Sequence, residues 1–358
     1  MNAIGLSQPV LRPIELPSLR GVLSSLWVSD LAMDLGTANT LIYVKGRGIV
    51  VNEPSVVAVD EETEKPIAIG SAAKEMYGKT SQAVRCIRPM KDGVIADFDM
   101  ATLMIRHMLL QVCSRTSIRK PRIVIGVPSG ITQVEKRAVI DAALSSGVRQ
   151  VHLVEEPMAA AVGAGLPIHK PCGNMIVDIG GGTTEVAIIS MNGTAYSHSI
   201  RVAGDEMDEA IVRHMRREHN LQVGIFEAER IKLVIGSALA FDHQRQARVF
   251  GRDMVTGIPQ QVDVSDEEIR YALNEPIRVI VSSIIAALEQ TSPEIAQDIM
   301  SRGIYVAGGG ALIKGLTERL QRETGLPFFR ASDPLSCVVR GVGQVLENLK
   351  EMQEVCIC

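Results

Sequence analysis

Two segments of this chain repeat one pattern, and the repetition restricts the fold more than any other feature. Residues 31–44 (LAMDLGTANTLIYV) and 174–190 (NMIVDIGGGTTEVAIIS) each contain an apolar run that ends in aspartate, a turn rich in glycine and threonine, and a second apolar run. This order of residues predicts strand, tight turn, strand. Asp34 matches Asp178, and Gly36 matches Gly180. Two such hairpins predict two related α/β domains in one chain.

The composition of the two turns indicates an anion site. Glycine lets a backbone turn sharply and approach a ligand closely, and exposed backbone N–H groups at such a turn bind anions. A carboxylate beside them is a hard oxygen ligand for hydrated Mg²⁺. One such turn is more often a structural hairpin without a ligand. Two such turns in one chain favour a polyphosphate site that lies between them. The expected binding residues are Asp34, Gly36, Thr37, Ala38, Asn39, Asp178, Gly180, Gly181, Gly182, Thr183 and Thr184.

A third glycine turn lies near the C-terminus. Residues 304–313 (IYVAGGGALI) predict strand, glycine turn, helix, without the GxGxxG spacing of a dinucleotide site. Glycines at a helix N-terminus suit an α-phosphate and the base beside it. Read alone, the turn is as often structural as functional. The residues concerned are Gly308, Gly309, Gly310 and Ala311.

One glutamate stands between a predicted strand and a predicted helix. The strand at 151–154 is followed by Glu155, Glu156 and Pro157, and proline suits the first position of a helix. Glu156 therefore lies just outside the helix N-terminus at a strand end. A lone glutamate there is usually a cap, but beside two phosphate hairpins it is a candidate for chemistry.

These segments resemble a known family. The duplicated hairpin resembles that of the superfamily of actin, Hsp70 and sugar-kinase ATPases. The amino-acid sequences of six segments are similar to those of the MreB family of bacterial actins. The similarity runs from about Asp30 to about Leu349. The six segments are 34–46, 52–58, 87–97, 155–161, 203–211 and 228–232.

The resemblance implies an actin-like ATPase fold with ATP and Mg²⁺ in a cleft between the two domains. It implies slow hydrolysis coupled to polymerisation, and a role in rod cell shape through the organisation of peptidoglycan synthesis. The implied partners are further copies of the chain in paired protofilaments, the inner membrane surface, and membrane proteins of the MreC, MreD, RodZ and RodA type.

The resemblance also implies roles for single residues. Glu156 positions the attacking water with help from Thr183, and Asp34 and Asp178 hold Mg²⁺ through water. Glu229 and Lys232 share a helix face, and their spacing alone predicts a solvated ion pair. The resemblance instead implies that these two residues clamp the ribose and adenine. Val134, on a helix that starts with a capping box at Thr132, pairs protofilaments or packs inward.

The family divides each domain into an inner and a small outer subdomain. The predicted inner subdomain of the first domain (IA) comprises 30–57 and 91–170 with a returning helix at 338–352, and its outer subdomain (IB) comprises 58–90. In the second domain, the inner subdomain (IIA) comprises 171–206 and 271–337, and the outer one (IIB) comprises 207–270.

The N-terminal segment lies outside the resemblance. Residues 1–16 predict a disordered lead, and after them apolar residues recur at helical spacing over about 17–28. We expect a short amphipathic helix lying in the membrane interface. A core-packing helix is the alternative, and Arg20 and the serines disfavour a secretory signal. The membrane-facing residues are Leu19, Val22, Leu23, Leu26 and Trp27.

Composition excludes several classes. With 37 basic and 41 acidic residues, the net charge of −4 provides no basic field for nucleic acid. No apolar run approaches the roughly 18–20 residues of a membrane span, so we expect a cytoplasmic protein, peripheral on the inner face of the membrane. The six cysteines lack CxxC spacing and indicate neither a zinc site nor a disulfide framework. We expect Cys356 and Cys358 to lie in a frayed C-terminal tail.

Two other classes share the hairpins. An Hsp70-type chaperone needs a β-rich peptide-binding domain, for which the stretch after Gly310 leaves no room. A sugar or acetate kinase needs an acceptor pocket and turns over without polymerising. Both remain alternatives at the level of sequence.

Overall fold

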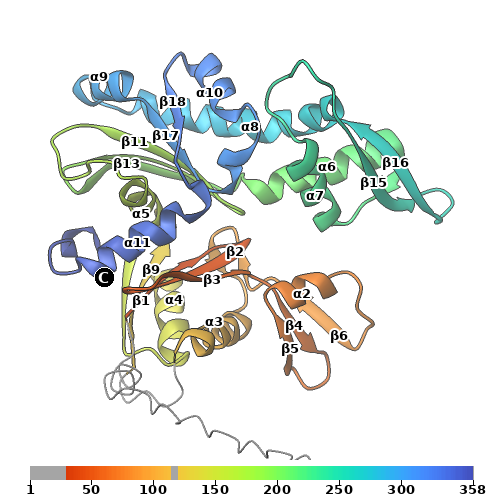
Figure 1. Ribbon diagram of the computed structural model, residues 1–358, viewed down its shortest axis with the longest axis horizontal. Coiled ribbons are helices and arrows are strands. Elements are labelled where there is room, and N and C mark those ends of the chain that lie inside the picture. Colours follow the sequence, from red (N-terminus) through yellow and green to blue (C-terminus); the bar gives the residue numbers. More distant parts are fainter. Residues whose placement is uncertain (1–29, 114–119, 358) are drawn as a thin grey trace, which may run out of the picture.

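Two five-stranded sheets organise the described part of the chain, residues 30–113 and 120–357 of a computed structural model (Figure 1). The predicted lead and amphipathic helix lie outside the described residues. The first sheet has the order β10-β9-β1-β2-β3 and the second β13-β12-β11-β17-β18. Their strands are β1 (Leu31–Leu35), β2 (Asn39–Val44), β3 (Gly48–Pro54), β9 (Arg122–Val127), β10 (Gln150–Glu155), β11 (Asn174–Ile179), β12 (Thr184–Ser190), β13 (Gly193–Ile200), β17 (Ile304–Ala307) and β18 (Phe328–Arg330).

The two sheets have the same topology. In the first, β1 pairs antiparallel with β2 and parallel with β9. In the second, β11 pairs antiparallel with β12 and parallel with β17. The repeated hairpins occupy corresponding places in two related sheets, so the predicted duplication is confirmed. We call the sheets with their covering helices the first half and the second half.

Two helices lie between the sheets, α5 (Glu156–Gly163) and α11 (Cys337–Glu347). One buried cluster joins Ala32 of β1, Ile176 of β11 and Val342 of α11. The two helices pack backbone to backbone, because a Cβ on Gly341 would overlap the carbonyl of Ala159. The predicted return of the last helix to the first half is present, although α11 ends at Glu347 rather than Met352.

The other faces of the sheets carry the remaining long helices (Figure 1). On the first sheet these are α3 (Phe98–Val112) and α4 (Gln133–Ser145), and α4 begins with the predicted capping box of Thr132 and Glu135. On the second sheet they are α8 (Asp266–Glu289), α9 (Pro293–Arg302) and α10 (Leu316–Thr324), whereas α6 (Gly204–His219) packs against α8 beside the second outer module.

Each half carries a small outer module, and the two modules lie on the same side of the molecule (Figure 1). The first module contains β4 (Val57–Asp60), β5 (Pro66–Ile69), β6 (Val84–Ile87) and α2 (Ser71–Met76), and is followed by the short pair β7 (Met90–Lys91) and β8 (Val94–Ile95). The second contains β14 (Leu221–Gln222), α7 (Ile225–Ile235), β15 (Gln246–Asp253) and β16 (Pro259–Ser265). The subdomain boundaries themselves stay a prediction.

One described helix, α8, is long and apolar enough to cross a membrane. The expectation that no such run exists is therefore wrong by length and composition. A buried core helix passes the same test, and Ile277, Ile280 and Ile284 of α8 are fully buried in the core of the second half. Packing against the second sheet accounts for the apolar face of this helix.

The C-terminal segment is ordered against the first sheet. Cys356 forms a bridge with Val154 of β10, and the N–H of Ile357 donates to the carbonyl of Leu153 at 2.9 Å. The expectation of a frayed tail is wrong for Cys356, because the edge of the first sheet offers free backbone groups to pair with. Cys358 lies outside the described residues.

Candidate functional site

The turns of the two hairpins touch each other. A Cβ on Gly181 would lie 2.8 Å from the Cβ of Ala38, and a Cβ on Gly182 would lie 2.8 Å from Oγ1 of Thr37. These distances leave no space for a side chain, so glycine is required at both places. The sequence predicted that both turns serve one site, and the structure brings them together.

An arginine ties the first hairpin to the second half. Arg88 donates from Nη2 to the carbonyl of Thr37 at 3.3 Å and to Oδ2 of Asp205 at 2.9 Å. The N–H of Asp205 donates to the carbonyl of Gly181 at 2.7 Å. Sequence reasoning missed this link, because Arg88 and Asp205 are far apart in the chain and neither belongs to a hairpin.

The hydroxyl of Thr37 is also engaged within the first half. It accepts a hydrogen bond from the N–H of Gly93 at 3.0 Å. A Cβ on Gly93 would lie 3.1 Å from Cγ2 of Thr183. The predicted residues Thr37 and Thr183 therefore lie against one backbone segment.

Three predicted carboxylates form one cluster. Asp34 and Asp178 are the penultimate residues of β1 and β11. Glu156, predicted just outside the helix, is the first residue of α5, and Glu155 is the N-cap. Removal from water raises the pKa of Asp34 to about 7. Burial, together with the charges of Asp34 and Glu185, raises the pKa of Asp178 to about 8. Burial and the charges of Asp34, Glu185 and Asp178 raise the pKa of Glu156 well above its ordinary value.

A fourth carboxylate, Glu185, was not predicted. It lies on β12 and is 1% exposed. Its oxygens accept hydrogen bonds from Oγ of Ser129 at 2.6 Å and from Oγ of Ser199 at 2.5 Å. Burial outweighs these bonds and raises its pKa. An acidic residue in an otherwise apolar strand is the signal that could have identified Glu185.

The acidic cluster fits a divalent cation. Oδ1 of Asp178 is buried and has no hydrogen-bond partner among the described residues. Within the same part of the chain, no lysine or arginine lowers the pKa of Asp34, Asp178 or Glu156. Buried charges need a partner, and hard oxygen ligands favour Mg²⁺. The residues present therefore suit the predicted metal ion.

The third glycine turn packs on the second hairpin. Gly308 has φ 78°, and a Cβ there would overlap Oδ1 of Asp178. The turn therefore lies beside the acidic cluster, as expected. The prediction of an α-helix directly after the glycines is wrong. Residues 309–312 form a short 3₁₀ helix, and Gly315, in the left-handed backbone conformation, separates it from α10. The backbone groups of this turn are thus not at an α-helix N-terminus.

Glu229 and Lys232 of α7 do not pair with each other. Nζ of Lys232 lies 2.9 Å from Oδ1 of Asp208 and donates to the carbonyl of Gly204 at 2.8 Å. Glu229 instead forms an ion pair at 2.7 Å with Lys74 of the first module. The prediction that Glu229 and Lys232 form a solvated ion pair with each other is therefore wrong. Lys232 reaches the start of α6 beside the second hairpin.

The other predicted residues fall in three places. Val134 is 80% exposed on α4, so its exposure is confirmed and its role in pairing stays a prediction. Gly36, Asn39, Gly180 and Thr184 lie within their hairpins. The membrane-facing residues lie outside the described residues.

Comparison with known proteins identifies the family. The model of the MreB/Mbl protein family matches residues 28–354. The cell shape-determining protein MreB of Escherichia coli (strain K12) is 50% identical over 339 residues, which cover 93% of this chain and 96% of that protein. The chain belongs to the MreB/Mbl family. The cell shape-determining protein Mbl of Bacillus subtilis (strain 168) is 43% identical over 327 residues, or 91% of this chain and 98% of Mbl.

Solved structures agree with the family. MreB5 of Spiroplasma citri bound to AMPPNP has a TM-score of 0.87 and 40% identity, covering 91% of this chain and 98% of that one. A MamK double helical filament has a TM-score of 0.76 at 24% identity, covering 89% and 99%, and supports the fold alone. The predicted actin-like fold is confirmed, and the chain is a bacterial actin of a cell-shape family.

Proposed function

We propose that this bacterial actin binds ATP with Mg²⁺ between its two hairpins, polymerises on the membrane, and hydrolyses ATP slowly within the filament. The filament would maintain rod shape by organising peptidoglycan synthesis. One observation carries the proposal. The turns of two duplicated hairpins meet beside a cluster of carboxylates that has no cationic partner among the described residues.

The proposed grip on the nucleotide follows from the hairpins. Backbone amides and hydroxyls around both turns are the donors that phosphate oxygens need, and Asp34 and Asp178 hold the hydrated metal. Mg²⁺, when bound, neutralises charge on the phosphates and on the acids. MreB5 of Spiroplasma citri was solved with AMPPNP and with ADP, which supports a nucleotide here. The phosphate-binding residues are Gly36, Thr37, Gly181, Gly182 and Thr183.

Glu156 is the proposed residue that positions water. It stands at the start of α5, and burial together with neighbouring negative charge raises its pKa. A carboxylate with a raised pKa is a better proton acceptor near neutral pH. The charges of Asp34 on the first hairpin and Asp178 on the second both act on Glu156, so closure of the two halves would change the position of this carboxylate relative to the hairpins. This coupling makes hydrolysis faster in filaments than in monomers.

Assembly and membrane attachment complete the proposal. The exposed Val134 on α4 supplies an apolar contact between protofilaments. The segment at 17–28 supplies the membrane contact, which is weak for one molecule and strong for an array through avidity. Membrane proteins of the MreC, MreD, RodZ and RodA type would then connect the filament to cell-wall synthesis.

The test of polymerisation uses purified protein with and without Mg-ATP. We expect light scattering to rise with Mg-ATP and phosphate release to follow assembly. Addition of candidate sugars or acetate should change neither signal. Turnover of a small metabolite without scattering would overturn the proposal in favour of a kinase.

The test of membrane attachment compares the full chain with a chain that starts at Ser29. The full chain should co-sediment with liposomes as a polymer, and the shortened chain should polymerise and remain in the supernatant. Electron microscopy on a lipid monolayer with ATP would show the filaments directly. Equal co-sedimentation of the two chains would contradict the role of residues 17–28.

A further inference from the structure

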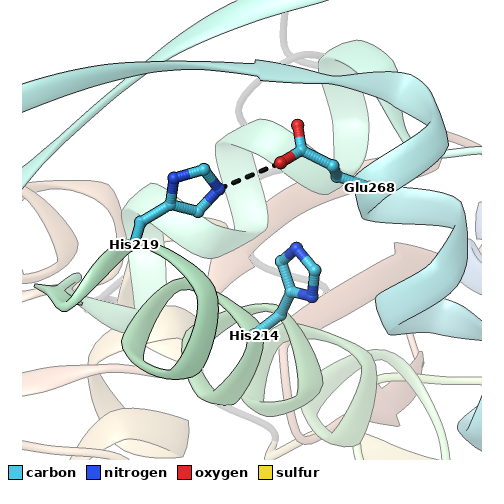
Figure 2. Close-up of side chains that lie close together, drawn as sticks. All are labelled: His214, His219 and Glu268. Carbon is cyan, nitrogen blue, oxygen red and sulfur yellow. Dashed lines mark hydrogen bonds and ion pairs between the residues drawn. The ribbon is translucent and has the colours of Figure 1, made fainter.

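A second group of metal-ligand side chains lies away from the hairpins, where α6 ends and α8 begins. Figure 2 shows His214 and His219 on α6 facing Glu268 on α8. One ligand atom of each residue lies within 4.8 Å of the others. We propose that His214, His219 and Glu268 bind a divalent transition-metal ion of the zinc class.

His214 provides the observation that points to a ligand. The residue is 6% exposed, and neither ring nitrogen has a hydrogen-bond partner among the described residues. A neutral imidazole has one donor and one acceptor nitrogen, and buried polar atoms are nearly always satisfied. A metal ion would occupy the free lone pair of one nitrogen, so the site gives this buried ring a partner.

The carboxylate is already oriented for the site. Oε2 of Glu268 accepts hydrogen bonds from the N–H of Ser265 at 2.8 Å and from its Oγ at 3.1 Å, which leaves Oε1 toward His219. The distance from Oε1 to Nε2 of His219 is 3.0 Å. Such hydrogen bonds to a ligand fix its orientation and raise metal affinity.

The spacing suits a small tetrahedral ion. Bonds of about 2.0–2.1 Å place two tetrahedral ligands roughly 3.4 Å apart, which lies between the 3.0 Å of the His219–Glu268 pair and the 4.8 Å limit of the group. The side chains of His219 and Glu268 are 20% and 35% exposed. An ion can therefore enter from solvent, small side-chain rotations can close the site, and water can fill the fourth position.

The ligand set selects the class of ion. Two imidazole nitrogens and one carboxylate oxygen suit Zn²⁺ and its neighbours, whereas Mg²⁺ and Ca²⁺ prefer oxygen ligands throughout. The acidic cluster at the hairpins has the opposite character. The two sites would therefore hold different metals in one molecule.

The location indicates a consequence for the second outer module. The chain enters this module through the end of α6 and leaves it through β16 into α8. The ligands come from both of these connections, so a bound ion would fasten them together. We expect Zn²⁺ to slow amide hydrogen exchange in β14 and at the start of α8.

The test is equilibrium dialysis of the full chain against buffered Zn²⁺, followed by elemental analysis. Excess Mg-ATP and a thiol-blocking step keep the acidic cluster and the cysteines from binding zinc. The wild type should bind one equivalent, and His219→Ala and Glu268→Gln should weaken binding at least about 10-fold. His243→Ala and Glu267→Gln, which alter exposed residues, are matched controls and should bind like the wild type.

A second readout separates ligation from folding. Co²⁺ at this site should give visible absorption bands that disappear in His219→Ala, while circular dichroism of that variant stays unchanged. Equal zinc binding by the wild type, His219→Ala and Glu268→Gln would overturn the proposal. So would the absence of zinc binding by the wild type, and His214 would then be a core residue packed beside Tyr271.

Discussion

The two hairpins have the same backbone plan and different electrostatic surroundings. In the strand pairing, Asp34 of the first hairpin lies opposite Leu41, whereas Asp178 of the second lies opposite Glu185. Asp34 is half-buried, and Asp178 is only 5% exposed. The difference between Leu41 and Glu185 at corresponding positions therefore gives the second hairpin an additional buried acidic group.

This difference shows that duplication of a scaffold does not duplicate its chemistry. Removal from water alone raises the pKa of Asp34, while Asp178 also experiences the charges of Asp34 and Glu185. The second half also holds the buried pair of Lys232 and Asp208. Asp178 thus carries a larger electrostatic cost than Asp34, which a bound cation would offset.

The largest expected effect concerns Glu156, on which the aspartates of both hairpins act. Glu156→Gln should lower phosphate release about 10²–10⁴-fold, because the amide cannot accept a proton from water. ATP binding and assembly, measured by fluorescence titration and light scattering, should persist. Glu155→Gln, at the preceding N-cap position, is the matched control. Normal hydrolysis by Glu156→Gln would remove this residue from the proposed mechanism.

The buried pair of the second half gives the next effect. Lys232→Ala should lower the free energy of unfolding by about 3–5 kcal/mol, because it leaves Asp208 without its buried partner. Denaturant unfolding of the nucleotide-free protein at pH 8 measures this loss. Burial raises the pKa of Asp208 to about 6, so protonation should make the loss smaller at pH 5. A loss that does not depend on pH would contradict this account.

The two aspartates provide the direct comparison of the hairpins. Asp34→Asn and Asp178→Asn should each weaken Mg²⁺ binding about 10–100-fold, as expected for groups that act through metal-bound water. Without metal, both substitutions should stabilise the fold near neutral pH, and Asp178→Asn should do so more, since the pKa of Asp178 is raised further than that of Asp34. Thermal melts with and without Mg²⁺ would measure both changes. Equal stabilisation by the two substitutions would mean that the hairpins are electrostatically equivalent.

The pH dependence tests the charge from Glu185. The pKa of Asp178 in the fold is about 8, against an ordinary 3.8. Its contribution to stability is therefore complete below pH 4 and is lost as the pH rises to 8. The slope is at most about 1.4 kcal/mol per pH unit for one group. Glu185→Gln should reduce this loss in the metal-free protein, and an unchanged melting profile from pH 6 to 9 would contradict the assignment.

The smallest effect concerns the contact between the outer modules. Lys74→Ala should lower the free energy of unfolding by only about 0.2–1 kcal/mol, because the Lys74–Glu229 pair is partly exposed. The same substitution should increase hydrogen exchange in α2 and α7, since it removes an ion pair between the two outer modules. A stability loss as large as that of Lys232→Ala would contradict the distinction between the exposed and buried pairs.

Local patterns predicted much of the architecture. Alternation of apolar and turn residues predicted both hairpins, and the spacing of Thr132 and Glu135 predicted the start of α4. Pro157 predicted the start of α5 within one residue. These features depend on neighbours in the chain, so the sequence contains their whole cause. The 3₁₀ helix after Gly308 was missed, because three glycines specify a tight turn without specifying the helix type.

The sequence by itself determined that two acidic glycine turns exist and that each ends a buried strand. The tertiary structure alone decided that the turns touch, that Arg88 joins Thr37 to Asp205, and that Glu185 adds its charge to Asp178. It also decided that His214 and His219 face Glu268. The physical reason is that a pKa, an ion pair or a ligand set depends on distances through space, which arise only when the halves pack together.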